Sequence, residues 1–252
     1  MYTLTLLALV QSLTEFLPVS SSGHLLFLQL LGVSEQGLAV DVALHVGTLL
    51  AVVLYFRRDI IEMLCFKNIV LMGQLFVATI PVVLIGLVIH FFHLSLPRNA
   101  WVVGIGSIFF GWLLWRVDDV RVCHRKIGQM TCKDALCIGL AQVLSLIPGT
   151  SRSGITITCA RWLGFKREDS ARFSMLLSIP TITLAGLYVL LQVYTGNAAL
   201  PNHFDLAMAC GFAAIFGLCA IAFLMQWVQK ASFFVFALYR IIFGLIVLGL
   251  VL

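Results

Sequence analysis

The sequence predicts an all-α membrane protein that crosses the bilayer several times. Of its 252 residues, 61% are hydrophobic and only 11% are charged, and the mean hydropathy is +1.06. Soluble domains carry about 25% charged residues, and one aqueous core cannot bury so many long apolar stretches. A transmembrane barrel would instead show alternating segments of about ten residues, which this sequence lacks. We therefore expect a polytopic helical protein that forms a single membrane-embedded domain over residues 1–252.

Two of the apolar regions are interrupted, and the others are continuous. Residues 2–32 are broken by FLPVSSSGH, and residues 133–163 are broken by LIPGTSRSG. Each half is too short to span a bilayer, which predicts two re-entrant helical hairpins whose irregular tips are buried in protein or line a wet cavity. The continuous regions each approach the about 20 residues that a full transmembrane helix needs. These six expected spans cover approximately residues 38–56, 70–92, 99–115, 173–194, 205–229 and 232–252.

The two interrupted regions are similar to each other and indicate an internal repeat. QSLT at 11–14 aligns with QVLS at 142–145, and Pro18 aligns with Pro148 after a gap of one residue. Chance similarity between apolar segments is common, so the repeat gains its weight from the distribution of charge along the chain.

Lys and Arg gather in loops that one threading places together on the cytoplasmic side, whereas the opposite loops hold only Arg98. In this threading the first hairpin enters from outside and the second from the cytoplasm, and three spans follow each hairpin. The pattern is typical of an inverted-topology repeat, whose site lies where the two broken segments meet near the midplane. The expected repeats are approximately 1–116 and 131–252, joined by a cytoplasmic linker at 117–130.

Charge and cysteine content exclude several other classes of protein. The net charge of +5 does not indicate a nucleic-acid partner, because the basic residues are scattered over short loops. The seven cysteines form no CxxC pair and no metal-ligand spacing, so we expect neither a disulfide framework nor a zinc site. The N-terminus lacks a basic region, which argues against a cleaved signal peptide. Loop carboxylates expected to be solvated are Asp118, Asp119, Glu168 and Asp169.

Arg152, within PGTSRSG, is the strongest sign of a binding site. A cation at a helix N-terminus opposes the helix dipole, and a cation inside a membrane costs about 2.5–3.5 kcal/mol on insertion scales. An anion at the same place removes both penalties, and first-turn N–H groups and hydroxyls would complete a phosphate site. The alternatives are pairing of Arg152 with Glu15 or snorkelling to the surface. The expected substrate-binding neighbours of Arg152 are Thr150, Ser151, Ser153 and Gly154.

The first hairpin supplies a second group of hydroxyls. Ser20, Ser21 and Ser22 precede a helix start, where one serine would suffice as a cap, so three indicate contact with a ligand as well. His24 follows Ser21 by three residues, so both side chains could share one helix face. A histidine there can accept a proton from a serine or a water and donate one to a leaving phosphate. A purely structural role for His24 is the alternative.

Glu15 is a carboxylate within the apolar part of the first hairpin, with Gln11 one turn earlier on the same face. Buried carboxylates pair, bind metal ions or act as acids and bases. Glu15 could therefore orient His24, hold a divalent cation or pair with Arg152, or it could be a protonated helix contact. Weaker candidates near the site are His45, Thr48, Ser174 and Ser178, and Arg240 is expected to lock helices together or to snorkel.

These motifs carry a family resemblance. QSLTEFLPVSSSGHL and PGTSRSG resemble the two signatures of bacterial undecaprenyl-diphosphate phosphatases, also called bacitracin-resistance proteins. ARFSMLLSIP at 171–180 and ALYRIIFG at 237–244 are similar to further segments of that family, so the resemblance covers essentially the whole chain. The first family motif often carries Glu at both ends of ExxxE. Gln11 stands at the first of these positions here, which puts a two-carboxylate mechanism in doubt.

The resemblance implies hydrolysis of undecaprenyl diphosphate to undecaprenyl phosphate and inorganic phosphate, which recycles the lipid carrier for peptidoglycan synthesis and confers bacitracin tolerance. It also implies a divalent cation, Mg²⁺ or Ca²⁺, with Glu15 as the candidate ligand. The expected location is the bacterial inner membrane, with the site open to the outer, periplasmic face. The expected partners are a polyprenyl diphosphate and the bilayer, without nucleic acid, and a homodimer is compatible with the sequence.

The residues suggest a mechanism and leave two questions open. Ser21 would attack the terminal phosphorus, His24 would act as base and then acid, and Glu15 would orient His24 or hold the cation. Arg152 and the helix N-termini would neutralise the phosphate charge, which is the main requirement of phosphoryl transfer. Direct attack by water is the rival chemistry. A polyprenyl-phosphate flippase or transporter is the alternative function, because broken helices in an inverted repeat also suit transport.

Overall fold

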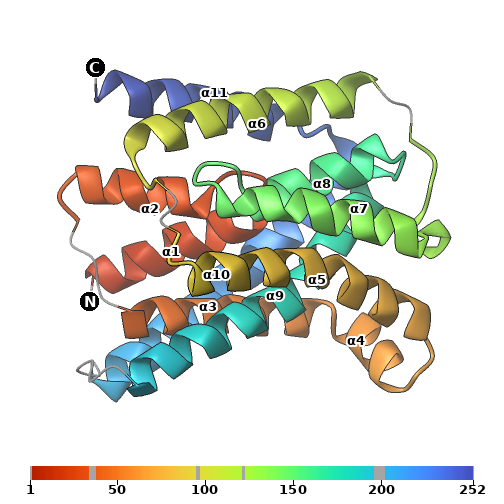
Figure 1. The fold of residues 1–252 in the computed structure, drawn as a ribbon, viewed down its shortest axis with the longest axis horizontal. Coiled ribbons are helices and arrows are strands. Elements are labelled where there is room, and N and C mark those ends of the chain that lie inside the picture. The colour runs from red at the N-terminus through yellow and green to blue at the C-terminus, as the bar shows by residue number, and fades with distance from the viewer. Residues whose placement is uncertain (1, 34–37, 95–96, 121–122, 196–201, 252) are drawn as a thin grey trace.

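The computed structural model describes residues 2–33, 38–94, 97–120, 123–195 and 202–251, and helices joined by turns and short irregular segments make up these ranges (Figure 1). Two short 3₁₀ turns, Ile127–Gln129 and Leu144–Leu146, connect longer elements. The α-helices are α1 (Tyr2–Phe16), α2 (Ser21–Leu30), α3 (Leu38–Tyr55), α4 (Arg57–Leu64), α5 (Ile69–Phe91), α6 (Ala100–Val120), α7 (Cys132–Val143), α8 (Arg152–Trp162), α9 (Arg167–Thr195), α10 (His203–Lys230) and α11 (Phe234–Gly249).

The all-α membrane fold is confirmed, but six full spans are not found among the described residues. Four helices are long and apolar enough to cross a membrane, and they lie in α5, α6, α9 and α10. A fifth span would consist of α3 and α4 together, although the chain bends by 79° between them. The sixth expected span is α11, which has only 16 residues. At 1.5 Å per residue it measures about 24 Å, less than the roughly 30 Å of a hydrocarbon core.

The start of α11, two residues later than expected, has a local cause. Residues 231–233 turn the chain back from α10, and Phe233 is fully buried there. The Phe233 N–H donates to Asp118 Oδ2 at 3.0 Å, so the turn is held against α6 and the helix begins only at Phe234.

The two interrupted regions form helix pairs with irregular tips, as expected. In the first pair, α1 and α2 pack together and the chain breaks at Pro18. In the second, α7 and α8 pack together around a tip that contains Pro148. Gly149 in this tip has a φ of +87° and a Cβ there would lie 2.5 Å from the Val103 carbonyl oxygen of α6, so only glycine fits.

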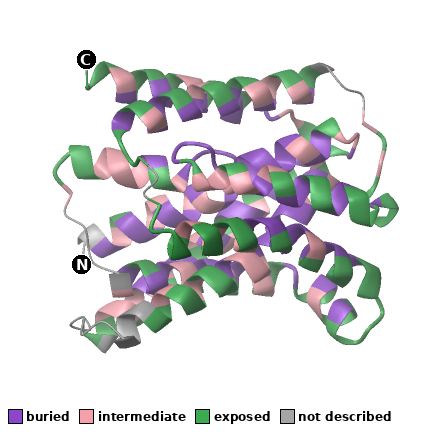
Figure 2. Cartoon of the chain, viewed as in Figure 1, coloured by how far each residue is buried: buried purple, intermediate pink, exposed green. Residues whose placement is uncertain are grey.

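The helices of the two hairpins and the longer helices pack against one another in defined pairs. α1 lies on α10 and α7 lies on α5, while α3 packs against both α9 and α10, and α6 packs against α11. Two glycines allow close helix crossings: a Cβ at Gly47 would collide with the Cys210 carbonyl of α10, and a Cβ at Gly139 would collide with the Ala78 carbonyl of α5. Exposed residues run along the outward faces of the helices, many of them large and apolar, as lipid contact requires (Figure 2).

Asp118 is not a solvated loop charge, contrary to expectation. Its side chain is about 3% exposed and accepts hydrogen bonds from Arg161 Nε at 2.8 Å and Arg167 Nε at 2.9 Å. The expected linker at 117–130 therefore packs against α8 and α9 in its described part.

Arg125 in the same segment pairs with Asp134 at 2.6 Å. Hydrogen bonding to Asp134 raises the pKa of Arg125 above its ordinary value, so this cation keeps its charge.

Candidate functional site

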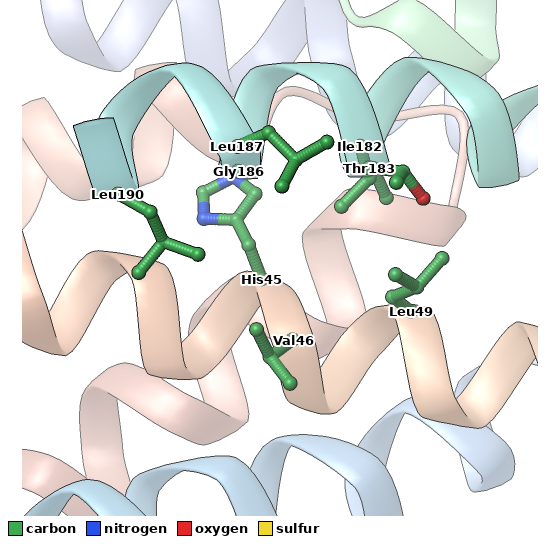
Figure 3. A pocket seen from close by; sticks show the side chains of 8 residues that line it. All are labelled: His45, Val46, Leu49, Ile182, Thr183, Gly186, Leu187 and Leu190. Carbon is green, nitrogen blue, oxygen red and sulfur yellow. The ribbon is translucent and has the colours of Figure 1, made fainter.

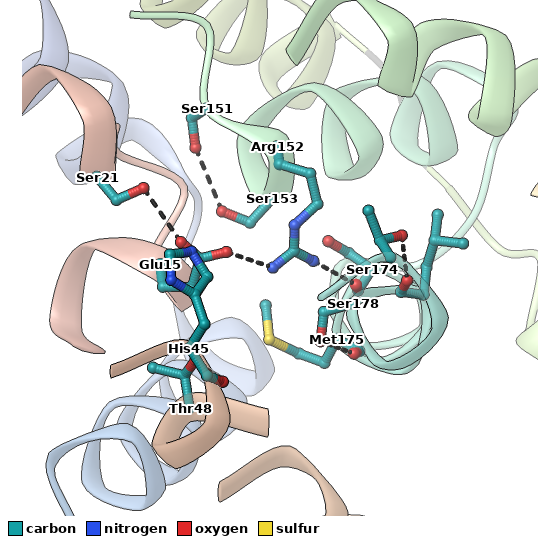
Figure 4. Close-up of polar contacts among 12 residues, drawn as sticks. Glu15, Ser21, His45, Thr48, Ser151, Arg152, Ser153, Ser174, Met175 and Ser178 are labelled. Atoms are coloured by element: carbon teal, nitrogen blue, oxygen red, sulfur yellow. Dashed lines mark hydrogen bonds and ion pairs between the residues drawn. The ribbon is translucent and has the colours of Figure 1, made fainter. Parts of the chain in front are cut away.

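An ion pair joins the two hairpins at the centre of the candidate site. Glu15 Oε1, near the end of α1, lies 2.9 Å from Arg152 Nη2, at the start of α8 (Figure 4). Both side chains are about 11% exposed, so water screens the pair only weakly. The pairing of Glu15 with Arg152, one of the possibilities left open by the sequence, is thus observed.

Two further donors converge on the same carboxylate. Ser21 Oγ donates to Glu15 Oε2 at 3.1 Å, and Gln11 Nε2 donates to the same oxygen at 3.2 Å. The expectation that Gln11 shares a helix face with Glu15 is confirmed. The Gln11 Oε1 atom is buried and has no hydrogen-bond partner among the described residues, so the site keeps one oxygen acceptor unused.

Arg152 is held on its other side by α9. Its Nη1 donates to the Ser174 carbonyl at 3.2 Å, and the Ser174 hydroxyl lies 2.7 Å from Thr156 Oγ1 of α8. Ser174 therefore lies at the site, as its position in the sequence suggested. The guanidinium uses Nη1 and Nη2 for these bonds and has five N–H groups in all, so it can take up further acceptors.

The remaining serines divide into caps and contacts between the tips. Ser20 Oγ accepts from Gly23 N at 3.4 Å and caps α2, and Ser151 Oγ accepts from Gly154 N at 3.2 Å and caps α8. Ser153 Oγ donates to the Leu17 carbonyl at 2.9 Å, which brings the two tips into direct contact. Further members of the expected set are Ser22, whose hydroxyl lies 3.3 Å from Ser20 Oγ, and Thr150, whose buried hydroxyl has no partner in the described chain.

His24 lies in different surroundings from those expected. Its Nδ1 donates to the Ser20 carbonyl at 2.6 Å, so in the neutral ring Nε2 accepts from the Tyr239 hydroxyl, also at 2.6 Å. The ring stacks on Phe243 with 4.2 Å between centroids. Neither ring nitrogen bonds to Ser21 or Glu15 in the described structure, so the expectation that Glu15 orients His24 is wrong here.

The reason is that the two side chains leave α2 in different directions. Ser21 is the first residue of the helix and turns back to α1, whereas His24 faces the aromatic surface of α11. A spacing of three residues does not ensure contact at a helix start, where tertiary partners decide. Tyr239 was missed by the sequence reasoning; its only signal was its place beside Arg240 in ALYRIIFG.

A different histidine accompanies the carboxylate. His45 of α3 lies close enough to Glu15 to act on it electrostatically, and Figure 4 shows the two side chains together. His45 Nδ1 donates to the Asp41 carbonyl at 2.7 Å, which fixes the ring and directs the other nitrogen away from α3. The sequence named His45 among the weaker candidates, and its polar character within an apolar helix was the signal.

Arg240 locks α11 to the tip of the second hairpin, and snorkelling is excluded because the residue is only about 2% exposed. Its Nη2 donates to the carbonyls of Gly149 at 3.0 Å and Thr150 at 2.6 Å. A Cβ at Gly154 would lie 2.6 Å from Arg240 Nη1, which explains a glycine at this helix position. Arg240 therefore positions the turn that carries Ser151, without touching Glu15.

We expect Arg240→Met to loosen this tip. The change leaves two buried carbonyls without donors, at a cost of about 1–3 kcal/mol in the free energy of unfolding. Hydrogen exchange of residues 147–154 should accelerate, and phosphate release should fall by at least about tenfold because the Arg152 backbone is less well fixed. Arg58→Met, at an exposed position in α4, is the matched control. Unchanged exchange and activity in the Arg240 variant would contradict this role.

The donor atoms fit a divalent cation only in part. Among the described residues there is no group of three or more His, Cys, Asp or Glu side chains that could hold a metal ion. Glu15 and the unused Gln11 Oε1 are nevertheless oxygen donors, the type that Mg²⁺ and Ca²⁺ prefer. Mg²⁺ is commonly held by one or two carboxylates together with substrate phosphates. The site therefore suits a cation shared between protein and diphosphate.

Comparisons with known proteins identify the family of the chain. The sequence model of the family described as "Bacitracin resistance protein BacA" matches residues 4–246. The protein named undecaprenyl-diphosphatase from Ruegeria pomeroyi is 44% identical over 263 residues, covering 99% of this chain and 98% of that protein. Proteins of the same name from Aliivibrio salmonicida and Alteromonas mediterranea are 43% and 41% identical, covering 94% and 100% of this chain and 93% and 98% of theirs. Because the match extends over nearly the whole length, the chain belongs to the bacitracin resistance protein BacA family.

Proposed function

We propose that this protein is a membrane phosphatase that hydrolyses undecaprenyl diphosphate to undecaprenyl phosphate and inorganic phosphate. The observation that carries the proposal is the cluster of Ser21, Glu15 and Arg152 at the contact between the two hairpins, in a chain whose relatives are named undecaprenyl-diphosphatase. The activity would return the lipid carrier to peptidoglycan synthesis and raise tolerance to bacitracin.

Binding of the diphosphate would begin with a change of partner for Arg152. Phosphate oxygens match the planar guanidinium fork better than a single carboxylate oxygen does, and Arg152 has N–H groups to spare. Once Arg152 faces phosphate, the Glu15 carboxylate is free to act on its other neighbour, Ser21. The unused Thr150 hydroxyl at the tip and the N–H groups at the start of α8 add donors for phosphate.

In the proposed chemistry, Ser21 Oγ attacks the terminal phosphorus and Glu15 Oε2 accepts the hydroxyl proton. The bond between phosphorus and the bridging oxygen breaks, and undecaprenyl phosphate leaves with that oxygen. Water then attacks the phosphoserine, which releases inorganic phosphate and restores the Ser21 hydroxyl. Glu15 replaces His24 as the base because Ser21 bonds to Glu15 at 3.1 Å and His24 bonds elsewhere. Direct attack by water, with Ser21 binding phosphate, is the rival.

Glu15 and Gln11 would hold the divalent cation together with oxygens of the diphosphate. The cation would supply further neutralisation of phosphate charge. The Glu15 carboxylate would act both as the base for Ser21 and as a cation ligand, because its two oxygens face different partners. Oε2 faces Ser21 and Gln11, and Oε1 faces Arg152.

The inverted repeat and the orientation belong to the same proposal. Helices at equivalent places in the two proposed repeats make equivalent contacts. The packing of α1 on α10 in one repeat matches that of α7 on α5 in the other. α6 packs on its equivalent α11, and α3 packs on its equivalent α9. α4, which begins with Arg57 and Arg58, and the described part of the α6–α7 connection, which holds Arg125 and Lys126, lie at the end of the molecule opposite the chain termini (Figure 1). With this end in the cytoplasm, the first hairpin enters from the periplasmic face of the inner membrane.

A flippase function and a homodimer are less well supported than the phosphatase function of a single chain. A flippase would use the same two hairpins, but transport needs no hydroxyl bonded to a carboxylate, and the relatives carry the name of a hydrolase. A homodimer would add nothing to this site, because one chain supplies both hairpins and every side chain described here.

The test is phosphate release from undecaprenyl diphosphate by the purified protein in detergent. We expect release with Mg²⁺ or Ca²⁺ and at least about tenfold less after chelation with EDTA, because the protein alone does not complete a cation site. Restoring the metal should restore the rate. If folded protein releases no phosphate with any divalent cation, the phosphatase proposal is wrong.

A further inference from the structure

A groove between α3 and α9 begins beside the candidate site. It encloses about 160 Å³ (Figure 3). His45 and Leu49 line it from α3, and Ile182, Gly186 and Leu190 are among the lining residues from α9. Most of the lining is apolar, and Leu190 is exposed on the outer surface of the helix bundle, so the groove is open to the surrounding lipid.

His45 connects this groove to the charged cluster. The same imidazole that lines the groove reaches from α3 toward the Glu15 carboxylate (Figure 4). On α9, Ser174 binds Arg152, and Ile182 follows eight positions later, about 12 Å along the helix. The groove therefore starts where the polar site ends and continues along α9 away from Arg152.

A second apolar hollow provides a comparison for the groove, because its lining does not include any residue of the polar cluster. That hollow, of about 350 Å³, lies on α6 and is lined by Ile105, Ile108, Phe109 and Trp112. Its four lining residues are all apolar, and none of them belongs to the polar cluster of Glu15, Ser21 and Arg152. Size alone therefore does not single out the groove; its continuity with the polar cluster does.

We propose that the α3–α9 groove binds the first isoprenoid units of the polyprenyl chain, with His45 at the junction between diphosphate and chain. The inference rests on the proposed function. A polyprenyl diphosphate joins an anionic head directly to an apolar chain, so a head at Arg152 requires an apolar path that starts at the edge of the polar cluster, where His45 lies. The groove provides that path and leads the rest of the chain into lipid.

Gly186 allows a direct test of this proposal. A Cβ placed there meets no other atom within 4 Å, so a larger side chain can extend into the groove without moving the backbone. Gly186→Phe should raise KM for undecaprenyl diphosphate about tenfold, equivalent to about 1.4 kcal/mol of binding, and change kcat less than about twofold. Hydrolysis of dimethylallyl diphosphate, whose chain is a single isoprene unit, should keep its kcat/KM.

Gly211→Phe is the matched control, because Gly211 is an exposed glycine of α10 that lies outside the groove lining, and a Cβ added there would also meet no atom within 4 Å. Its KM for the long substrate should equal that of the wild type. Equal KM values for Gly186→Phe and wild type would overturn the proposal, and so would an equal loss in both glycine variants.

A second measurement does not depend on turnover. An undecaprenyl methylenediphosphonate with a diazirine on its second isoprene unit should label α3 at 45–49 and α9 at 182–190 on illumination. Labelling confined to other helices would overturn the proposal. A diazirine phospholipid that labels the groove and is not displaced by the diphosphonate would also overturn it, by showing a bilayer lipid there. Because binding is read directly, labelling of the groove without phosphate release would refute only the proposed hydrolysis.

Discussion

Arg152→Ala is expected to lower kcat/KM for undecaprenyl diphosphate by at least about 10³-fold, the lower end of what an arginine contributes to phosphoryl transfer. The guanidinium is the cation at the contact between the hairpins, bonded to both Glu15 and Ser174. Without it, neither the ground-state diphosphate nor the charge developing in the transition state is neutralised. Phosphate release by purified variant and wild type at saturating Mg²⁺ measures the effect.

The same substitution also removes a structural ion pair, and the two effects must be separated. An uncompensated buried charge costs about 3–5 kcal/mol, so Arg152→Ala alone should also lower the thermal midpoint in detergent. Arg152→Ala combined with Glu15→Gln removes both charges and should restore much of the stability. Because Glu15 is itself the proposed base, this double variant is measured for stability only; if folded Arg152→Ala kept the wild-type kcat/KM, the role of Arg152 would be structural and the anion site would be refuted.

Ser21→Ala should be comparably severe, with a loss in kcat of at least about 10³-fold and a small change in KM, because a nucleophile acts in the chemical step. Ser22→Ala is the matched control: its hydroxyl is exposed and contacts Ser20, not Glu15. That variant should retain more than about half of the wild-type rate.

Trapping distinguishes the two roles that Ser21 can have. In a single-turnover quench with substrate labelled at the terminal phosphate, wild type should carry label on Ser21, and Ser21→Ala should carry none. If wild type stays unlabelled while product forms, water attacks directly and Ser21 only binds phosphate. The direct bond from Ser21 to Glu15 makes the first outcome the expected one.

Much of the site could be predicted because its signal is local. Glu15, Ser21 and Arg152 are polar residues in apolar surroundings, and each stands next to a proline-containing break in a helical pattern. Membrane energetics penalise such residues unless they meet a partner. The two breaks therefore had to meet, and the 2.9 Å ion pair and the bond from Ser153 to Leu17 show that they do.

The orientation of His24 could not be predicted, because the decisive partner is remote. The ring lies between the Ser20 carbonyl and Tyr239, and the second contact spans 215 positions of the chain. Asp118 is a similar case, since Arg161, 43 residues away, supplies the charge that makes its burial tolerable. Spacing along one helix contains no information on either contact.

The exact start of α11 could not be predicted for another reason. Hydropathy continues through residues 232–252, and composition alone cannot show where a helix starts. Its start is fixed by Phe233, which is buried beneath the turn and whose N–H bonds to Asp118 of another helix. Such boundaries depend on tertiary capping contacts, which apolar runs do not encode.

The ion pair between the hairpins also links chemistry to the biogenesis of the protein. Glu15 is synthesised 137 residues before Arg152, so the first hairpin enters the bilayer carrying a carboxylate without a counter-charge. A nascent or truncated chain keeps that exposed defect, whereas a finished one hides it. The same pair that would prepare the site for its substrate therefore makes the burial of the first hairpin depend on synthesis of the second.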